Sequence, residues 1–237
     1  MITTEDLIYR VDGVEFICHL AVSKTDKPKP AVLVFPSWAG RDSFVCDTAE
    51  LLANEGYVGV AIDLYGHARV GASKEENASL MTPLLEDRQS LAGRLEAVID
   101  AVSLHPQVDS SRIAVIGYCF GGLCALDCAR NNLAIRGAVS LHGALSSSNH
   151  GVSDQIQSPL LVLHGFEDPL VPMSDFTAFT QEMVARQANW ECDIYGNAMH
   201  AFTNPMANDH DFGTVYDKQS AYRSWHRTLG FLSECLD

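Results

Sequence analysis

Short apolar segments that alternate with helix-like segments constrain the fold of this chain more than any other feature. The apolar segments are nearly continuous in aliphatic and β-branched residues, and they cover residues 31–35, 58–64, 113–117, 137–141 and 160–164. Helical apolar spacing occurs between or after them, in residues 43–55, 84–104, 176–186 and 216–235. Strands of this composition are typical of mostly parallel sheets with helices on both faces, so we predict an α/β fold.

The N-terminal segments predict a different kind of pairing. Residues 8–11 and 14–22 flank Asp12-Gly13, and Asp-Gly between apolar alternations is a strong signal for a tight hairpin turn. The hairpin would add antiparallel strands at the edge of the sheet, and residues 190–195 would add one further strand. Residues 65–79 are polar and contain glycine, so we expect a loop there. No linker interrupts the pattern, and we predict a single domain over residues 1–237.

Charge and cysteine content limit the classes of partner. The formal net charge of −14 argues against nucleic acid and against an anionic membrane surface. The chain shows neither a secretory signal nor an apolar run of the ~20 residues that span a bilayer. The 7 cysteines lack the spacing of a zinc site, and without a secretory signal we expect free thiols in a reducing cytoplasm. We expect a monomer or a homodimer.

Cys119 stands where a β-branched strand gives way to a helix, in the sequence GYCFGG of residues 117–122. A nucleophile bracketed by glycines at such a turn adopts a strained conformation, which only small neighbours tolerate. Ligands collect at the carboxyl ends of parallel strands, and a helix N-terminus favours a thiolate. We therefore predict that Cys119 is a nucleophile; the alternative is a buried structural cysteine in a close-packed turn.

A thiol nucleophile needs a general base and a group that orients the base. His200 follows a strand and precedes an irregular segment, and it is our first choice for the base. His142 and His164 also stand at strand ends and remain alternatives. Asp168 comes just after a strand end, and the chain order of nucleophile, acid and base favours it as the orienting acid. Glu167 is the second choice.

The oxyanion of the reaction needs hydrogen-bond donors. The backbone N–H of Phe120, directly after Cys119, is the first expected donor. The second should come from the loop after the first core strand, residues 35–42, where we choose the backbone N–H of Trp38.

With these residues in view, the chain resembles the dienelactone hydrolase family of the α/β-hydrolase superfamily. The resemblance covers residues 10–235, and its motifs are DLYG at 63–66, GYCFGG at 117–122, HGFEDPLVP at 164–172 and YGNAMHAFTNP at 195–205. It implies an α/β-hydrolase fold and a triad of Cys119, His200 and Asp168. It further implies hydrolysis of a small ester or lactone through an acyl-enzyme, with neither metal nor cofactor.

The chain departs from the family pattern at two positions near the expected site. Ser37 stands where well-known members carry a glutamate, and Asn204 stands where they carry an arginine. We expect Ser37, Tyr118, Phe202 and Arg88 to line the substrate pocket. A small-acyl thioesterase, or a non-catalytic ligand-binding or regulatory protein on a hydrolase scaffold, is the alternative function.

Overall fold

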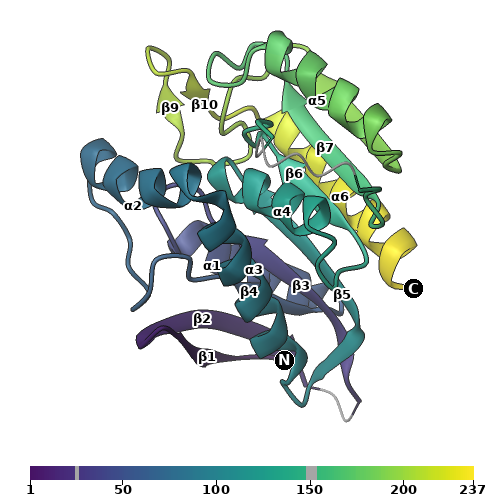
Figure 1. Cartoon of the computed structure of the whole chain (residues 1–237). Helices are drawn as coiled ribbons and strands as arrows, with labels where there is room; N and C mark the ends of the chain where they lie inside the picture. Colours follow the sequence, from purple (N-terminus) through teal and green to yellow (C-terminus); the bar gives the residue numbers. More distant parts are fainter. Residues whose placement is uncertain (25–26, 148–153) are drawn as a thin grey trace.

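The computed structural model describes residues 1–24, 27–147 and 154–237. Its centre is an 8-stranded sheet with the strand order β1-β2-β4-β3-β5-β6-β7-β8. The strands are β1 (Ile2–Val11), β2 (Val14–Ser23), β3 (Lys29–Phe35), β4 (Val58–Ala61), β5 (Val108–Tyr118), β6 (Ala138–Leu141), β7 (Leu160–Gly165) and β8 (Trp190–Tyr195). All neighbours from β4 to β8 pair in parallel, whereas β1 with β2 and β2 with β4 are antiparallel (Figure 1).

The N-terminal hairpin forms as predicted. Asp12 and Gly13 both have positive φ, of 49° and 81°, which suits the tight turn that the right-handed twist of two strands favours. Strand β1 lies at the edge of the sheet, and only Leu7 of its side chains is buried. The hairpin therefore extends the sheet on the side away from β6 to β8.

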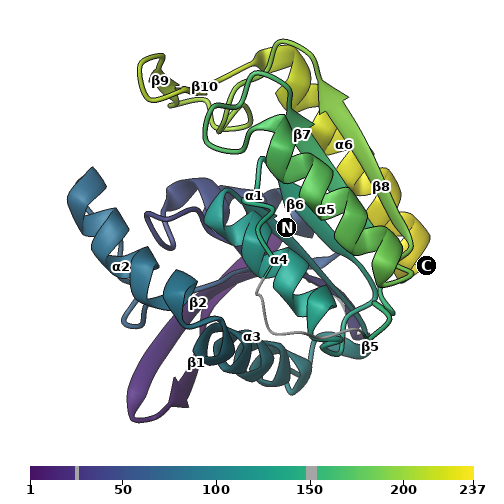
Figure 2. The same ribbon diagram turned by 45° about the horizontal axis from the view of Figure 1, so that its top comes forward.

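Helices cover both faces of the sheet, which confirms the predicted fold class. Alternate residues of β3 point to opposite faces: Val32 and Val34 pack with α1 (Ser43–Asn54) and α6 (Lys218–Leu236). Leu33 and Phe35 belong to the larger core on the other face, with α3 (Arg88–Ser103), α4 (Phe120–Arg130) and α5 (Met173–Ala185). Figure 2 shows α3, α4 and α5 on that face. Among the described residues, none of the helices combines the length and apolar character needed to cross a bilayer.

One predicted loop is partly a helix. Residues 65–79 were expected to lack regular structure, but α2 (Lys74–Glu86) begins inside this range. The hydroxyl of Ser73 accepts a hydrogen bond from the N–H of Glu76, and the carboxylate of Glu76 accepts one from the N–H of Ala72. These two hydrogen bonds fix the start of a helix that buries only Leu84, which is why apolar spacing gave no sign of its first turns.

One predicted helix is in fact two. The range 84–104 is interrupted at Asp87, whose side chain accepts a hydrogen bond from the N–H of Ser90 and caps α3. The pair of short strands β9 (Asn208–Asp209) and β10 (Thr214–Val215) was not predicted either. Helix α2 and the pair β9–β10 both contribute residues to the site described next.

Candidate active site

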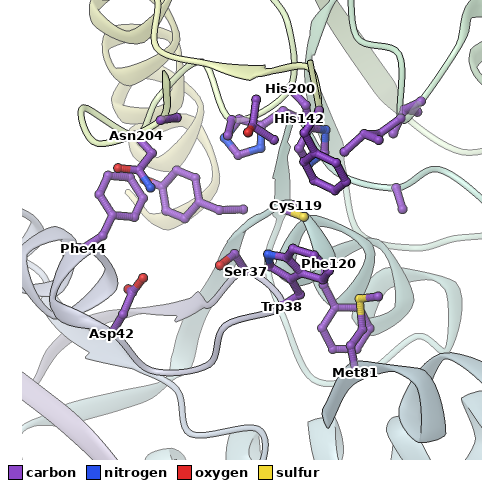
Figure 3. A pocket seen from close by; sticks show the side chains of 18 of the residues that line it. Ser37, Trp38, Asp42, Phe44, Met81, Cys119, Phe120, His142, His200 and Asn204 are labelled. Carbon is purple, nitrogen blue, oxygen red and sulfur yellow. The ribbon is translucent and has the colours of Figure 1, made fainter. Parts of the chain in front are cut away.

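Cys119 lies in a sharp turn between β5 and α4, at the carboxyl end of the sheet. Its backbone is in the left-handed region, with φ 56° and ψ −116°, and it is the N-cap of α4. A Cβ atom on Gly117 would overlap the carbonyl of Gly121, and one on Gly121 would overlap the carbonyl of Phe35. The glycines are therefore needed because backbone segments approach each other here, and the turn leaves Cys119 on the pocket wall (Figure 3).

Cys119 and His200 shift each other's pKa. Burial raises the pKa of the Cys119 thiol, but the His200 ring and the backbone N–H groups of Phe120 and Trp38 outweigh burial and lower it below its usual value. Burial likewise opposes a charge on His200, yet the Cys119 sulfur and the Asp168 carboxylate raise the pKa of His200 to about 10. Both shifts favour a thiolate beside an imidazolium at neutral pH.

Asp168 holds the far side of the His200 ring. The Nδ1 of His200 donates to Oδ2 of Asp168 over 2.7 Å, and both side chains are buried. The other carboxylate oxygen, Oδ1, accepts hydrogen bonds from the backbone N–H groups of Leu170 and Val171. Glu167, the second choice for the acid, is exposed. On the pocket side the ring of His200 interacts with the Cys119 sulfur, and its Nε2 forms no hydrogen bond with a nitrogen or oxygen atom of the described residues.

The unpredicted pair β9–β10 helps to place His200. The backbone N–H of His200 donates to the carbonyl of Gly213, and the N–H of Val215 donates to the carbonyl of His200, each over 3.0 Å. The backbone on both sides of the ring is thus fixed by a segment more than ten residues downstream.

The other strand-end histidines occupy different positions. His142 lines the pocket, and its Nε2 lies 2.8 Å from the hydroxyl of Thr203. His164 stacks on Phe176 outside the pocket lining. Burial lowers the pKa of both rings, and neither forms a hydrogen bond with a carboxylate among the described residues. Neither is placed like His200.

The DLYG segment supports the loop that carries Trp38. Buried Asp63 accepts hydrogen bonds from the backbone N–H groups of Tyr65, Gly66 and Ala68, which folds the chain after β4. The hydroxyl of Tyr65 then donates to the carbonyl of Trp38 over 2.9 Å. Tyr65 therefore orients the peptide of Trp38; sequence reasoning identified the motif but not this task.

The cavity above Cys119 has a volume of about 370 Å³. Its lining is mainly apolar and aromatic, and it consists of Ser37, Trp38, Asp42, Phe44, Met81, Leu85, Tyr118, Cys119, Phe120, His142, Ala144, Leu170, Val171, His200, Ala201, Asn204, Ala207, Phe212 and Thr214. Helix α2 supplies Met81 and Leu85, and the chain between and within β9 and β10 supplies Phe212 and Thr214. The sequence predicted a helix at Leu85 but neither the first turns of α2 nor β9–β10, and it did not place any of these elements beside Cys119.

Ser37 and Tyr118 line the pocket, but the expectation is wrong for Phe202 and Arg88. Phe202 is fully buried behind the wall, with its ring against His142 at 5.2 Å. The guanidinium of Arg88 is also buried, and it donates to both carboxylate oxygens of Asp127 in α4. A buried guanidinium without a partner would destabilise the fold strongly, so Arg88 lies where it can pair with a carboxylate.

No group of three or more His, Cys, Asp or Glu side chains among the described residues is arranged to hold a metal ion.

A family model described as the dienelactone hydrolase family matches residues 17–236. The chain belongs to the dienelactone hydrolase family. Membership makes it a hydrolase of ester bonds that acts on small molecules.

Several relatives of this dienelactone hydrolase family member align over most of the chain. A protein of Bradyrhizobium sp. named "Probable 2-oxo-3-(5-oxofuran-2-ylidene)propanoate lactonase" is 30% identical over 231 residues, which are 93% of this chain and 90% of that protein. A solved dienelactone hydrolase-like promiscuous phosphotriesterase from metagenomic libraries is 32% identical, with a TM-score of 0.95. The match covers 100% of this chain and 99% of that one.

Proposed function

We propose that this protein hydrolyses small carboxylic esters or lactones with Cys119 as nucleophile, His200 as acid and base, and Asp168 as the group that orients His200. One observation carries the proposal. A thiol whose pKa is lowered stands on a pocket wall beside an imidazole whose pKa is raised to about 10. This combination is typical of an activated cysteine nucleophile and unusual for a structural cysteine.

The proposed reaction has an acylation and a hydrolysis step. The thiolate of Cys119 attacks the carbonyl carbon, and the resulting tetrahedral intermediate collapses to a thioester as His200 gives its Nε2 proton to the departing alkoxide. Water then loses a proton to His200 and attacks the thioester, which releases the carboxylic acid and restores the thiolate. Asp168 keeps the Nε2 edge directed at the reacting atoms through its bond to Nδ1.

The backbone N–H groups of Phe120 and Trp38 are proposed to hold the oxyanion. Both already lower the pKa of the Cys119 thiol, which means that they stabilise negative charge at this place. In comparable enzymes, the loss of one oxyanion donor raises the barrier by about 3 to 4 kcal/mol.

The test is the hydrolysis of 4-nitrophenyl acetate by Cys119→Ala and by a matched control, Cys192→Ala. Cys192 is a half-buried thiol of β8 outside the pocket, and burial raises its pKa to about 12. We expect Cys119→Ala to lose turnover and Cys192→Ala to keep it. Mass spectrometry of rapidly quenched wild-type enzyme should find the acetyl group on Cys119. Turnover that survives in Cys119→Ala would refute the proposal.

A thioesterase would use the same residues, so acyl thioesters belong in the substrate screen. A purely binding protein would not activate its thiol. Rapid alkylation of Cys119 by iodoacetamide near neutral pH, with loss of esterase activity, would therefore separate an enzyme from a binding protein.

We also propose a reducing compartment such as the cytoplasm for this enzyme. All 7 cysteines are free thiols, and partly exposed free cysteines such as Cys46 and Cys119 would be at risk of oxidation outside such a compartment.

A further inference from the structure

The charges around the pocket are unevenly distributed. The undescribed residues, 25–26 and 148–153, contain neither lysine nor arginine, so all 16 basic side chains of the chain belong to the described part. None of the 16 lines the cavity. Arg88 pairs with Asp127, and Lys74 pairs with Asp209 while its Nζ lies 4.3 Å from the ring centroid of the pocket residue Phe212. Arg41, the neighbour of Asp42 in the chain, directs its guanidinium to the sulfur of Cys46.

Asp42 is the carboxylate on this wall that the proposed mechanism does not use. It caps α1, where its Oδ1 accepts a hydrogen bond from the N–H of Val45 over 3.2 Å. The side chain is half-buried, and among the described residues it has no ion-pair partner. Figure 3 shows the carboxylate group of Asp42 on the left of the pocket, below Phe44 and Asn204. Partial burial raises the pKa of Asp42, so a cation placed beside it would be favoured.

The rest of the wall suits a cation better than an anion. The rings of Trp38, Phe44 and Tyr118 line the wall, and Trp38 stacks on Phe212. The ring of Phe212 already carries the Lys74 ammonium group at 4.3 Å from its centroid, so this aromatic pair accommodates a cation. Aromatic faces attract ammonium groups and repel carboxylates. The formal net charge of −14 adds a negative long-range electrostatic potential, which also attracts cations and repels anions. In the triad itself, the thiolate of Cys119 and the carboxylate of Asp168 surround a single imidazolium.

We propose that the pocket selects esters or lactones that are uncharged or positively charged over those that carry a carboxylate, and that Asp42 is the specificity-determining residue for this preference. The inference rests on the proposed hydrolysis by Cys119. It assigns a substrate class: acyl or alkyl groups with an ammonium group or with no charge, and with a size that a cavity of about 370 Å³ accepts.

The experiment compares three 4-nitrophenyl esters of similar length, whose acyl chains end in a trimethylammonium, a tert-butyl or a carboxylate group. The value of kcat/KM is measured at low and at high ionic strength. At low ionic strength we expect the cationic ester to exceed the anionic ester by about tenfold or more, with the neutral ester between them. Salt should reduce the ratio, because screening weakens partly exposed charges.

Asp42→Asn tests the assigned residue. Asparagine caps a helix about as well as aspartate, so α1 should keep its start while the charge is lost. The matched control is Asp217→Asn, because Asp217 caps α6 with a hydrogen bond from Ser220 and lies outside the pocket lining. We expect the ratio of cationic to anionic ester to fall at least about threefold in Asp42→Asn, and to stay unchanged in Asp217→Asn.

Asn204→Arg provides a second test that does not depend on how well Asp42→Asn folds. Asn204 is a half-buried pocket residue, so an arginine there would place a cation on the wall. We expect the anionic ester to gain most in this variant. Thermal unfolding of each variant checks that the fold persists.

The outcomes separate the two proposals. Equal turnover of all three esters by wild type and by Cys119→Ala would overturn the proposed function. Turnover that depends on Cys119 but is as fast for the anionic as for the cationic ester would overturn the charge preference. A preference for the cation that persists unchanged in Asp42→Asn would overturn the role of Asp42.

Discussion

The two sides of the pocket are built in different ways. The side that carries Cys119 is a turn between β5 and α4, and every residue of α4 is buried. The opposite side comes from α2, which buries only Leu84, and from the short pair β9–β10. Lys74 of α2 bridges this side by its ion pair with Asp209 of β9. The core thus fixes Cys119, whereas the peripheral elements shape the space for the substrate, and β9–β10 also holds the backbone of His200.

Substitutions on the two sides of the pocket should therefore have different consequences. Substitutions near Cys119 should damage the reaction or the fold itself, because backbone segments there are in close contact. Substitutions in α2 should change which substrates bind, at little cost in stability, whereas substitutions in β9–β10 should also disturb the position of His200.

The largest effect is expected for Asp168→Asn, measured as kcat/KM for 4-nitrophenyl acetate. Loss of the carboxylate leaves the His200 imidazolium without its partner at Nδ1, and activity should fall by about 10⁴-fold, as in other triads. Glu167→Gln, the exposed neighbour, should stay within a factor of about two of wild type. A similar loss in both variants would mean that the loop, and not the Asp168 carboxylate, matters.

The next effect concerns stability of the Cys119 turn. Gly117→Ala places a Cβ against the carbonyl of Gly121 and should lower the free energy of unfolding by about 1 to 3 kcal/mol, measured by urea denaturation. Gly93→Ala in α3 meets no atom within 4 Å and should raise stability by about 0.5 to 1 kcal/mol. Equal effects of the two alanines would show that the backbone contact is not tight.

A third prediction compares thiols by their pH dependence. The pKa of Cys119 is lowered, so its thiolate should persist as the pH falls below the usual thiol range, whereas burial raises the pKa of Cys192 to about 12. Near neutral pH, iodoacetamide should therefore alkylate Cys119 at least about tenfold faster than Cys192, as measured by peptide mass spectrometry. On the alkaline side, turnover should decline around pH 10 as His200 loses its proton. Equal labelling rates would contradict the ion pair.

The smallest effect is expected on the peripheral side. Lys74→Ala removes an exposed ion pair with Asp209 and a contact at 4.3 Å with the ring of Phe212. Stability should change by about 0.5 kcal/mol or less, but KM should rise severalfold with little change in kcat, because the wall loses an anchor. Arg10→Ala removes an equally exposed ion pair on the hairpin, away from the pocket, and should leave KM unchanged.

The comparison also explains which predictions from the sequence succeeded. The strands 31–35 and 160–164 were found to within a few residues, because buried strands need continuous apolar or β-branched runs. The strand 190–195 was also found, although it lies at the sheet edge and none of its residues is fully buried. The hairpin at Asp12-Gly13 was also predicted correctly, because the local backbone geometry of these two residues determines the turn. Membership of the family follows from the motifs around these elements.

Peripheral elements left weaker signals. Helix α2 buries only Leu84, so the apolar spacing of its first turns was too poor to separate them from a loop. The pair β9–β10 is too short to leave a pattern in the sequence. Met81 and Phe212 were therefore missed, Leu85 was predicted as helical but not as a lining residue, and Arg88 was assigned to a pocket that it does not reach.

The sequence by itself determined the sheet, the turn at Cys119 and the residue types available for a triad, because these depend on patterns within a few neighbouring positions. Tertiary structure decided that Asp168, and not Glu167, contacts His200, and that Tyr65 orients the Trp38 peptide. It also decided that Asp42 lines the pocket while Arg88 pairs with Asp127. Charges act through distance in space, and the distance between residues far apart in the chain is fixed only when the whole sheet and its helices have packed.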